Sequence, residues 1–436
     1  MASTFRIFAS GVLVAACGGA VAQSPAPAPA RVDVRMWTLL GGGDGARMRT
    51  LVEQFNASQT QARVLVTTLT WGEPFYTKVM TSTAVGAGPD LATVHLSRMA
   101  NLIGAQTVRP LTSAELAAAG LKADDFYPRL WQKASRGGTA YAVPLDSHAL
   151  VMYYNKALLA KAGLLDAEGK LKPIEGMAAL TSAIRTVKEK TGMQGVTMES
   201  GPNSYLIWRL WLSLLAQRGA RVITDGHFSY GKDGEVALAD VANWFAKGYA
   251  SRGLDYPAAT SQFMSGKAGF MINGVWEVPS LVAAASQPGA FDYGIVPLPK
   301  LYGNASVWGD SHAFAVPNNA GKPIAPAKLA ATLKFVAYVS RHSLTWASGG
   351  HIPAYVAVAE SAPALALVPN ASYARAVAAN VVYDPEGWYA GAAGPLQASS
   401  AKFLPAALSG QLTPAQALSM FEDEAGKLLV RRQPKP

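Results

Sequence analysis

Cysteine, charge and long apolar runs are all scarce in this chain. Cys17 is the single cysteine among 436 residues, so stability must come from the core and not from an internal disulfide. Charged residues make up only 15% of the chain, and the net charge of +10 is spread thinly. No basic block of about five residues indicates nucleic-acid binding. Beyond the N-terminal segment, no apolar run reaches the roughly 18 residues of a transmembrane helix.

Motifs of common enzyme classes are also missing. No G-x-S-x-G nucleophile elbow occurs. Asp310, Ser311 and His312 are adjacent, but neighbouring strand residues face opposite sides, so they cannot form a catalytic triad among themselves. No histidine pair has a metal-ligand spacing such as H-x-x-x-H, so the sequence predicts no metal, no cofactor and no catalytic residue. The paired carboxylates of a glycosidase stay open, because sequence spacing does not fix their distance.

The N-terminal segment has the parts of an export signal. A basic residue precedes the apolar stretch Ile7–Ala16, and small residues follow. Two processing sites stay open. We favour cleavage after the A-x-A motif Ala20–Ala22, which would release a soluble protein, over the lipobox-like Val14–Cys17, which would leave Cys17 lipidated. We therefore expect residues 1–22 to be a signal peptide and the mature protein to be periplasmic, with a lipid anchor as the alternative.

The segment after the export signal has the composition of a linker. SPAPAPA (Ser24–Ala30) is typical of an extended spacer, which we place at 23–31. Half of all residues are apolar, which is enough for two lobes with separate cores. Residues 431–436 form a short basic tail.

Strand and helix patterns alternate from Val32 on, which favours an α/β fold with a parallel or mixed sheet. The first strand pattern is followed by a helical stripe at Met48, Leu51, Val52 and Phe55. Further strands are expected at 63–69 and 91–94, and a helix at 75–85. Longer helical patterns follow at 181–191, 204–218, 235–250, 333–339 and 414–430.

Six segments, taken in order, resemble one protein family. They are VRMWTLLGGGDGARMRTLVEQFNAS near the start, GPDLATVHLS (Gly88–Ser97), YAVPLDSHALVMYYNKALLAKAGL (Tyr141–Leu164), FMSGKAGFMINGVWEVPSL (Phe263–Leu281), FDYGIVPLPK (Phe291–Lys300) and WGDSHAFAVPNNA (Trp308–Ala320). The resemblance that they carry extends over nearly the whole mature chain. In this order they resemble family 1 of the extracellular solute-binding proteins of ATP-driven importers, which captures sugars and glycerol phosphates.

The resemblance implies a two-lobed periplasmic-binding-protein-like α/β fold (type 2), with the ligand cleft between lobes that are joined by hinge crossings. We expect lobe 1 at 32–144 and 297–340, lobe 2 at 145–296 and 341–430, and crossings near Val143–Ser147, near Tyr293–Pro299 and after Val339. It also implies a monomer that captures a mono- or oligosaccharide, binds no nucleic acid, and delivers its ligand to membrane permease subunits of an ABC importer.

A sugar has apolar C–H faces and a rim of hydroxyls, so its site needs flat aromatic rings and hydrogen-bonding side chains. Trp276 lies in NGVW, a small-residue turn between a strand and a helix, where the family places an aromatic against the ligand. Trp37, Gly42 and Gly43 lie at the C-terminal end of the first strand, where open α/β sheets bind ligands. The alternative to ligand contact is that Trp276 belongs to the core of a lobe. For Trp37, Gly42 and Gly43 the alternative is that they only form a turn.

Other candidates follow strand ends or lie at the expected first crossing. Trp71 and Glu73 follow the second strand, where an acidic residue beside an aromatic suits a pair of sugar hydroxyls. Asp90 precedes the third strand, and its pattern is more typical of a residue that caps a turn. Asp146 and His148 lie at the first crossing, where they would face the cleft between the lobes.

The second half of the chain adds aromatic and loop candidates. Tyr205 and Trp208 are three residues apart and share one face of a helix, where the family often offers aromatics. The resemblance also places an expected loop that contains Gly309 and Asp310 at the cleft. It places Tyr355 and Trp388, near the end of the chain, at the cleft as well.

The glycine run after the first strand has the shape of a phosphate cradle, in which backbone N–H groups and a helix N-terminus bind an anion. The dinucleotide fingerprint G-x-G-x-x-G and the P-loop Lys-Ser/Thr are both missing. Two other functions stay open. One is binding of sn-glycerol 3-phosphate or a glycerophosphodiester, for which Arg209, Lys267 or Arg375 could supply charge although nothing marks them. The other is a secreted glycoside hydrolase.

Overall fold

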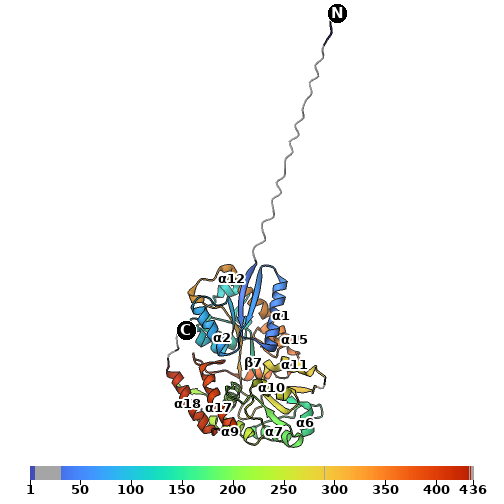
Figure 1. Ribbon diagram of the computed structural model, residues 1–436, viewed down its shortest axis with the longest axis vertical. Helices are drawn as coiled ribbons and strands as arrows, with labels where there is room; N and C mark the ends of the chain where they lie inside the picture. The colour runs from blue at the N-terminus through green and yellow to red at the C-terminus, as the bar shows by residue number, and fades with distance from the viewer. Residues whose placement is uncertain (5–30, 289, 432, 434–436) are drawn as a thin grey trace.

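The computed structural model describes residues 1–4, 31–288, 290–431 and 433. The expected processing sites, Cys17 and nearly all of the expected signal peptide and linker fall within 5–30, outside the described residues, as does most of the tail. Within the part that is described, no helix has both the length and the apolar character that crossing a membrane requires. Figure 1 shows the folded part as two lobes, one above the other.

The first lobe is built on a five-stranded sheet in the order β2-β1-β3-β14-β6. β1 is parallel to β2 and β3, whereas β14 is antiparallel to β3 and β6. The strands are β1 (Val32–Thr38), β2 (Ala62–Thr68), β3 (Leu91–His95), β6 (Val143–Pro144) and β14 (His312–Ala315). Helices α1 (Gly42–Ser58), α2 (Glu73–Ala84) and α12 (Pro326–Arg341) flank this sheet in the upper lobe of Figure 1.

The predicted stripe of α1 is confirmed, because Met48, Leu51, Val52 and Phe55 are all buried in the first lobe. A helix with one apolar face packs that face against the sheet. The packing holds the N-terminus of α1, at Gly42, directly after the C-terminal end of β1.

The second lobe is built on a larger sheet around β7 (Asp146–Asn155), whose 10 residues are all buried. The sheet runs β16-β13-β7-β11-β8, and β12 and β15 also pair with β7. The other strands are β8 (Gln194–Thr197), β11 (Ala268–Gly274), β12 (Tyr293–Pro297), β13 (Val307–Asp310), β15 (Ile352–Pro353) and β16 (Val381–Val382). The main helices are α6 (Lys156–Ala162), α7 (Met177–Thr191), α8 (Leu206–Gln217), α9 (Gly231–Ala246), α10 (Tyr256–Met264), α11 (Val278–Ala285), α17 (Pro395–Ser409) and α18 (Pro414–Val430).

The two-lobed α/β fold expected from the sequence is confirmed, and core membership locates the crossings between the lobes. The first core takes its buried residues from 34–145 and 313–354, and the second core from 149–308 and 352–428. Two crossings therefore fall near 145–149 and 308–313, and the third begins near Ile352. The last two come later in the chain than the boundaries expected at 297 and 340. Pro297 is no hinge, because it pairs with Val151 as a residue of β12.

The loop predicted over Trp308–His312 is not found. Its first three residues end β13, and His312 begins β14, because both segments are buried and pair with neighbouring strands. Gly309 pairs with Ala149 of β7, and an ideal Cβ on Gly309 would lie 2.7 Å from the carbonyl oxygen of His148. The close approach of β7 therefore explains the glycine.

One buried carboxylate, that of Asp146, contacts a histidine at each of the three crossings. Its Oδ1 lies 3.1 Å from Nδ1 of His148, and its Oδ2 lies 2.8 Å from Nδ1 of His312 and 3.1 Å from Nδ1 of His351. Two further donors complete its shell: the indole N–H of Trp346 at 2.7 Å and the backbone N–H of His312 at 2.8 Å. We name Asp146, His148, His312 and His351 the crossing cluster.

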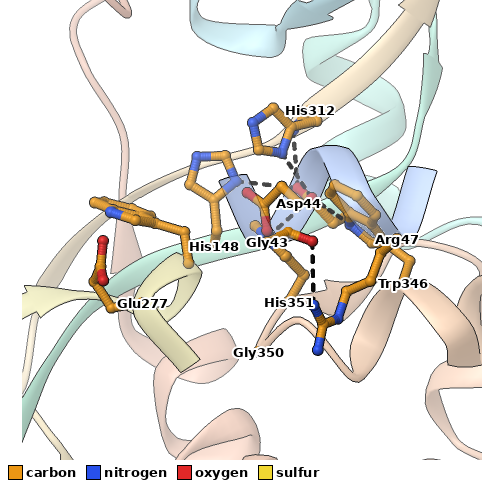
Figure 2. Close-up of polar contacts among 12 residues, drawn as sticks. Gly43, Asp44, Arg47, His148, Glu277, His312, Trp346, Gly350 and His351 are labelled. Carbon is orange, nitrogen blue, oxygen red and sulfur yellow. Dashed lines mark hydrogen bonds and ion pairs between the residues drawn. The ribbon is translucent and has the colours of Figure 1, made fainter. Parts of the chain in front are cut away.

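Charge balance in the crossing cluster depends on His351. Its Nε2 lies 3.0 Å from Oδ1 of Asp44 in α1, so the ring lies between two carboxylates (Figure 2). Burial alone would lower the pKa of His351, but Asp44 and Asp146 raise it to about 10, which makes it an imidazolium at neutral pH. Burial would raise the pKa of Asp146, but the three facing histidines hold it well below its usual range. Burial lowers the pKa of His148 to about 4, so this ring is neutral.

We expect the stability of the protein to depend on pH through His351. The folded chain holds this proton more tightly than the unfolded chain, so the stabilisation is complete below pH 6.5 and is lost as pH rises through about 10. Tm measured by calorimetry should therefore fall more steeply between pH 7 and pH 10 in wild type than in His351→Gln. His227→Gln, at an exposed histidine, is the control and should follow wild type. Parallel pH profiles of wild type and His351→Gln would contradict this assignment.

We expect Gly309→Ala to destabilise the protein by about 1–3 kcal/mol, because the new methyl group overpacks the contact between β13 and β7. Gly426→Ala in α18 is the matched control, since its methyl group would meet nothing within 4 Å. Alanine there should be neutral or stabilising by about 0.5–1 kcal/mol, because it favours a helix interior over glycine. Urea unfolding measures both variants, and equal stability would show that the strand contact is not tight.

Candidate ligand-binding site

A cavity of about 490 Å³ lies between the two lobes. Such a volume is within the ~300–1,000 Å³ that small-molecule sites occupy. The first lobe contributes the turn between β1 and α1, Trp71 after β2, and His95 at the end of β3. The second lobe contributes side chains from the start of α8, the start of α10, and the turn between β11 and α11. A molecule in this cavity would touch both lobes.

Aromatic side chains form one wall of the cavity, and they surround a cation. The guanidinium carbon of Arg209 lies 4.6 Å from the ring centroid of Trp308, 5.2 Å from that of Trp276 and 5.8 Å from that of Trp71. Tyr205 packs edge-on against Trp71 with ring centroids 5.8 Å apart. The wall thus offers flat faces of the kind that stack on sugar rings.

Arg209 is buried without a charged partner in contact. Within the described residues its side chain forms no ion pair within 4.0 Å, and its Nε has no hydrogen-bond acceptor. Burial lowers the pKa of Arg209, and the nearby carboxylate of Glu199 opposes that shift. A buried guanidinium with free donors facing a cavity is costly unless a ligand supplies acceptors.

The glycine turn brings bare backbone to the cavity. Gly42 has φ of +51° at the start of α1, a conformation that glycine adopts without strain. An ideal Cβ on Gly43 would lie 2.3 Å from Cβ of Pro279 in α11, so a side chain there would collide with the second lobe. The N-terminus of α1 is therefore held against α11, with N–H groups available to a polar ligand.

Two acidic side chains, those of Glu277 and Glu199, also line the cavity, and each already accepts a hydrogen bond from the protein. Glu277 accepts a hydrogen bond from the hydroxyl of Tyr256, which in turn accepts from the indole N–H of Trp276 at 2.7 Å. Glu199 accepts from the hydroxyl of Ser204 at 3.0 Å. Burial raises the pKa of both carboxyl groups. Their carboxyl oxygens can accept hydrogen bonds from hydroxyl groups of a ligand.

Histidines also gather at the cavity, although their spacing in the sequence predicts no metal site. Two overlapping groups of buried residues place possible ligand atoms within 4.8 Å of one another: the crossing cluster, and His95 with His148 and Asp310. Burial lowers the pKa of His95 well below its usual range, so the ring is neutral. The spacing argument misses these groups because their members come from separate segments that meet only in the fold.

Six of the predicted site residues line this cavity: Gly42, Gly43, Trp71, His148, Tyr205 and Trp276. The predicted turn around Trp276 is confirmed, since it lies between β11 and α11. Contact of these six residues with a ligand stays a prediction.

Other predicted residues have different surroundings, and they are not among those that line the cavity. Trp208 is fully buried in the second core and donates its indole N–H to Asp384 at 2.7 Å, because this face of α8 packs inward. Asp90 accepts from the backbone N–H of Arg35 at 2.8 Å and pairs with Lys328 at 3.2 Å. Asp90 thus links β1 and α12 to the segment before β3 through long-range contacts, and no capping of a turn by its side chain is found among the described residues.

Some predicted residues lie at the edges of the lobes. Trp37 is a residue of β1, and Nζ of Lys78 lies 6.0 Å from the centroid of its ring. Glu73 is the first residue of α2, and its side chain is exposed. The last predicted tyrosine and tryptophan contact other parts of the protein: Tyr355 packs against Phe126, and Trp388 donates its indole N–H to the carbonyl of Arg431.

Three predicted residues are buried beside the cavity rather than exposed to it. Asp146 is the centre of the crossing cluster, and Gly309 lies in the contact between β13 and β7. Asp310 accepts hydrogen bonds from the hydroxyl and the backbone N–H of Ser97. Burial raises the pKa of Asp310 to about 6. These residues fix the geometry of the histidines that reach the cavity.

Sequence reasoning missed much of the lining: Leu39, Leu40, Gly41, Asp44, His95, Glu199, Asn203, Tyr256, Glu277, Ser280, Trp308 and His312. His95 ends a predicted strand, which is the same signal that selected Trp71. Glu277 directly follows Trp276 in one turn. Glu199 and Tyr256 gave no such signal, because the loop after β8 and the start of α10 reach the cavity only through the packing of the second lobe.

Comparisons with known proteins place this geometry in context. The sn-glycerol-3-phosphate-binding periplasmic protein UgpB of Pectobacterium atrosepticum is 25% identical over 185 residues, which is 42% of this chain. The chain spans only 41% of the length of that relative.

Several solved structures have the same fold. Maltose-bound MalE3 of T. maritima gives a TM-score of 0.77 at 19% identity, over 90% of this chain and 98% of that one. The GacH receptor of Streptomyces glaucescens, solved unliganded and with acarbose, gives a TM-score of 0.74 at 21% identity, over 92% of this chain and 99% of that one. Lmo0181 of Listeria monocytogenes, an ABC substrate-binding protein in complex with cycloalternan, gives a TM-score of 0.75 at 16% identity, over 92% of this chain and 100% of that one.

A family match accounts for the fold and the cavity together. The family model described as bacterial extracellular solute-binding protein matches residues 42–343, more than half of the chain. The matched range contains the crossings at 145–149 and 308–313 and most of the cavity lining. The chain belongs to the bacterial extracellular solute-binding proteins.

Proposed function

We propose that this protein captures a carbohydrate, either a mono- or an oligosaccharide, and delivers it to membrane permease subunits of an ABC importer. The observation that carries this proposal is the pair of accessible aromatic side chains, Trp71 and Trp276, in a cavity that both lobes line. Stacking on C–H faces and hydrogen bonds from the polar rim are what a sugar requires. The names of solved neighbours agree, since they mention maltose, acarbose and cycloalternan.

Capture would work by closure of the lobes on the ligand. A ligand that touches Trp71 of the first lobe and Trp276 of the second stabilises the closed arrangement relative to an open one. The crossings absorb the rotation, as hinge segments do in proteins of this kind. The permease would then recognise the closed form.

The remaining parts of the proposal follow from the family and the sequence. An extracellular family and the export-like N-terminal segment support a periplasmic location, with lipidation of Cys17 as the alternative. We propose that the protein acts as a monomer, without nucleic acid and without catalysing a reaction. The rival glycoside hydrolase needs a pair of carboxyl groups that flank the bond to be cleaved, and Glu199 and Glu277 are the two glutamates that line the cavity. Release of reducing ends from oligosaccharides by the purified protein would support that rival.

One observation favours a second ligand class, glycerol 3-phosphate or a glycerophosphodiester. The unpaired guanidinium of Arg209 and the N-terminus of α1 at Gly42 both face the cavity, and both suit an anion. The curated relative is a glycerol-3-phosphate-binding protein by name.

We expect Trp276→Ala to weaken sugar binding by roughly 30-fold, because truncating a central aromatic anchor costs about 2 kcal/mol. A thermal-shift screen of mono-, di- and trisaccharides identifies the ligand first, since a ligand that binds the folded state raises Tm. Isothermal titration then compares the variants. Trp388→Ala is the matched control, because Trp388 does not line the cavity and contacts Arg431. Unchanged affinity in Trp276→Ala would remove Trp276 from the binding wall.

We expect Arg209→Met to separate the two ligand classes. If the ligand is an anion, the change should abolish binding of glycerol 3-phosphate while Arg209→Lys retains part of it, because a charge of the same sign remains. If the ligand is a neutral sugar, both variants lose hydrogen bonds and weaken binding to a similar extent. A Tm increase with glycerol phosphates and none with any sugar would overturn the carbohydrate proposal.

A further inference from the structure

Two overlapping groups of buried residues bring histidines and carboxylates together, and they differ in how many of their polar atoms have partners. In the crossing cluster, Asp146 receives three ring nitrogens at 2.8–3.1 Å and two further N–H donors. The rings of His148 and His312 are hydrogen-bonded to Asp146, and the imidazolium of His351 forms an ion pair with it and balances its charge. The carboxylate of Asp146 is therefore paired without an ion.

The second group, His95 with His148 and Asp310, contains ring nitrogens that have no hydrogen-bond partner among the described residues. Nδ1 of His148 is held by Asp146, and Nδ1 of His95 lies 2.7 Å from the hydroxyl of Tyr76. Nε2 of each ring has no hydrogen-bond partner among the described residues, and both rings line the cavity. Nε2 of His148 keeps a free lone pair because Asp146 accepts the proton on Nδ1. Nε2 of His95 keeps one when its Nδ1–H donates to Tyr76, whose oxygen also accepts the backbone N–H of His95 at 3.0 Å.

We propose that His95, His148 and Asp310 bind one divalent transition-metal ion, of the zinc class, at the wall of the cavity. One ligand atom of each residue lies within 4.8 Å of the others, so small side-chain shifts bring all three to the ~2.0–2.2 Å that zinc requires. Two imidazoles and one carboxylate are a ligand set that such ions prefer, and it leaves positions open toward the cavity.

The partners behind these three residues support the proposal. Metal-bound histidines usually donate their second N–H to a carboxylate or another oxygen, which fixes the ring. Asp146 does this for His148, and Tyr76 can do it for His95. The Asp310 carboxylate is likewise oriented, by the Ser97 hydroxyl and by N–H groups of Ser97 and Ser311. Hydrogen bonds from surrounding residues thus fix the orientation of all three side chains.

The charged groups near the three residues have opposing effects on a cation. Arg209 opposes one, whereas the carboxylates of Asp146, Asp310 and Asp384 favour one.

An ion at this place would coordinate oxygen atoms of the captured molecule. Vicinal hydroxyls of a sugar, or the oxygens of a phosphate, could take the open positions, and this part rests on the proposed function. Binding of the ion alone does not rest on it, because it needs only the three side chains.

The test uses full-length mature protein without a histidine tag, first dialysed against a chelator. Co²⁺ is titrated while visible absorption is recorded, and Zn²⁺ binding is measured by calorimetry, both without sugar. We expect one ion per chain, with a Co²⁺ spectrum unlike that of the hydrated ion. His95→Gln and Asp310→Asn should lose it, and Tyr76→Phe should weaken it about 10–100-fold. His227→Gln, at an exposed histidine, should bind as wild type does.

The outcomes separate this proposal from its alternatives. A hydrated-ion spectrum for Co²⁺ with wild type at millimolar concentration would overturn it, and so would unchanged affinity in His95→Gln. Loss of binding in His227→Gln would assign the ion to the surface instead. Circular dichroism melting checks that each variant folds, and the wild-type spectrum decides even if a variant does not. A sugar titration with and without Zn²⁺ then asks separately whether the ion assists capture.

Discussion

The contact on which the arrangement of the lobes depends is the one between the buried carboxylate of Asp146 and a histidine from each crossing. A charge without access to water must be paired and hydrogen-bonded, or the fold pays heavily for it. Here the pairing comes from three segments that are distant in sequence. The three segments must therefore meet for the charge to be stable, which makes the junction between lobes specific rather than merely apolar.

The cavity takes its shape from that junction. His148 and His312 are held by Asp146 through Nδ1, and they turn their other edges toward the cavity. Across from them, Arg209 lies among three tryptophans with no anion in contact within the described residues. The guanidinium of Arg209 is thus the charged group of the cavity that lacks a partner among the described residues.

Local patterns predicted much of the fold, and they failed where contacts are long-range. The stripe of α1 and the turn at Trp276 follow from spacing and small residues, and both are found. Trp308 was expected in a loop, but pairing with neighbouring strands placed it in β13. Trp208 has the same helical spacing as a ligand-facing aromatic, and only the packing of the second lobe shows that it faces the core. The histidine groups could not be predicted, because their members are not neighbours in sequence.

Gly43 bears on how closely the two lobes approach each other. Its missing Cβ leaves room for Pro279, so the first turn of α1 packs directly against α11. A methyl group at this position would overlap with Pro279 and would require the two helices to lie farther apart. The distance between the lobes at this edge of the cavity therefore depends on the absence of a single methyl group.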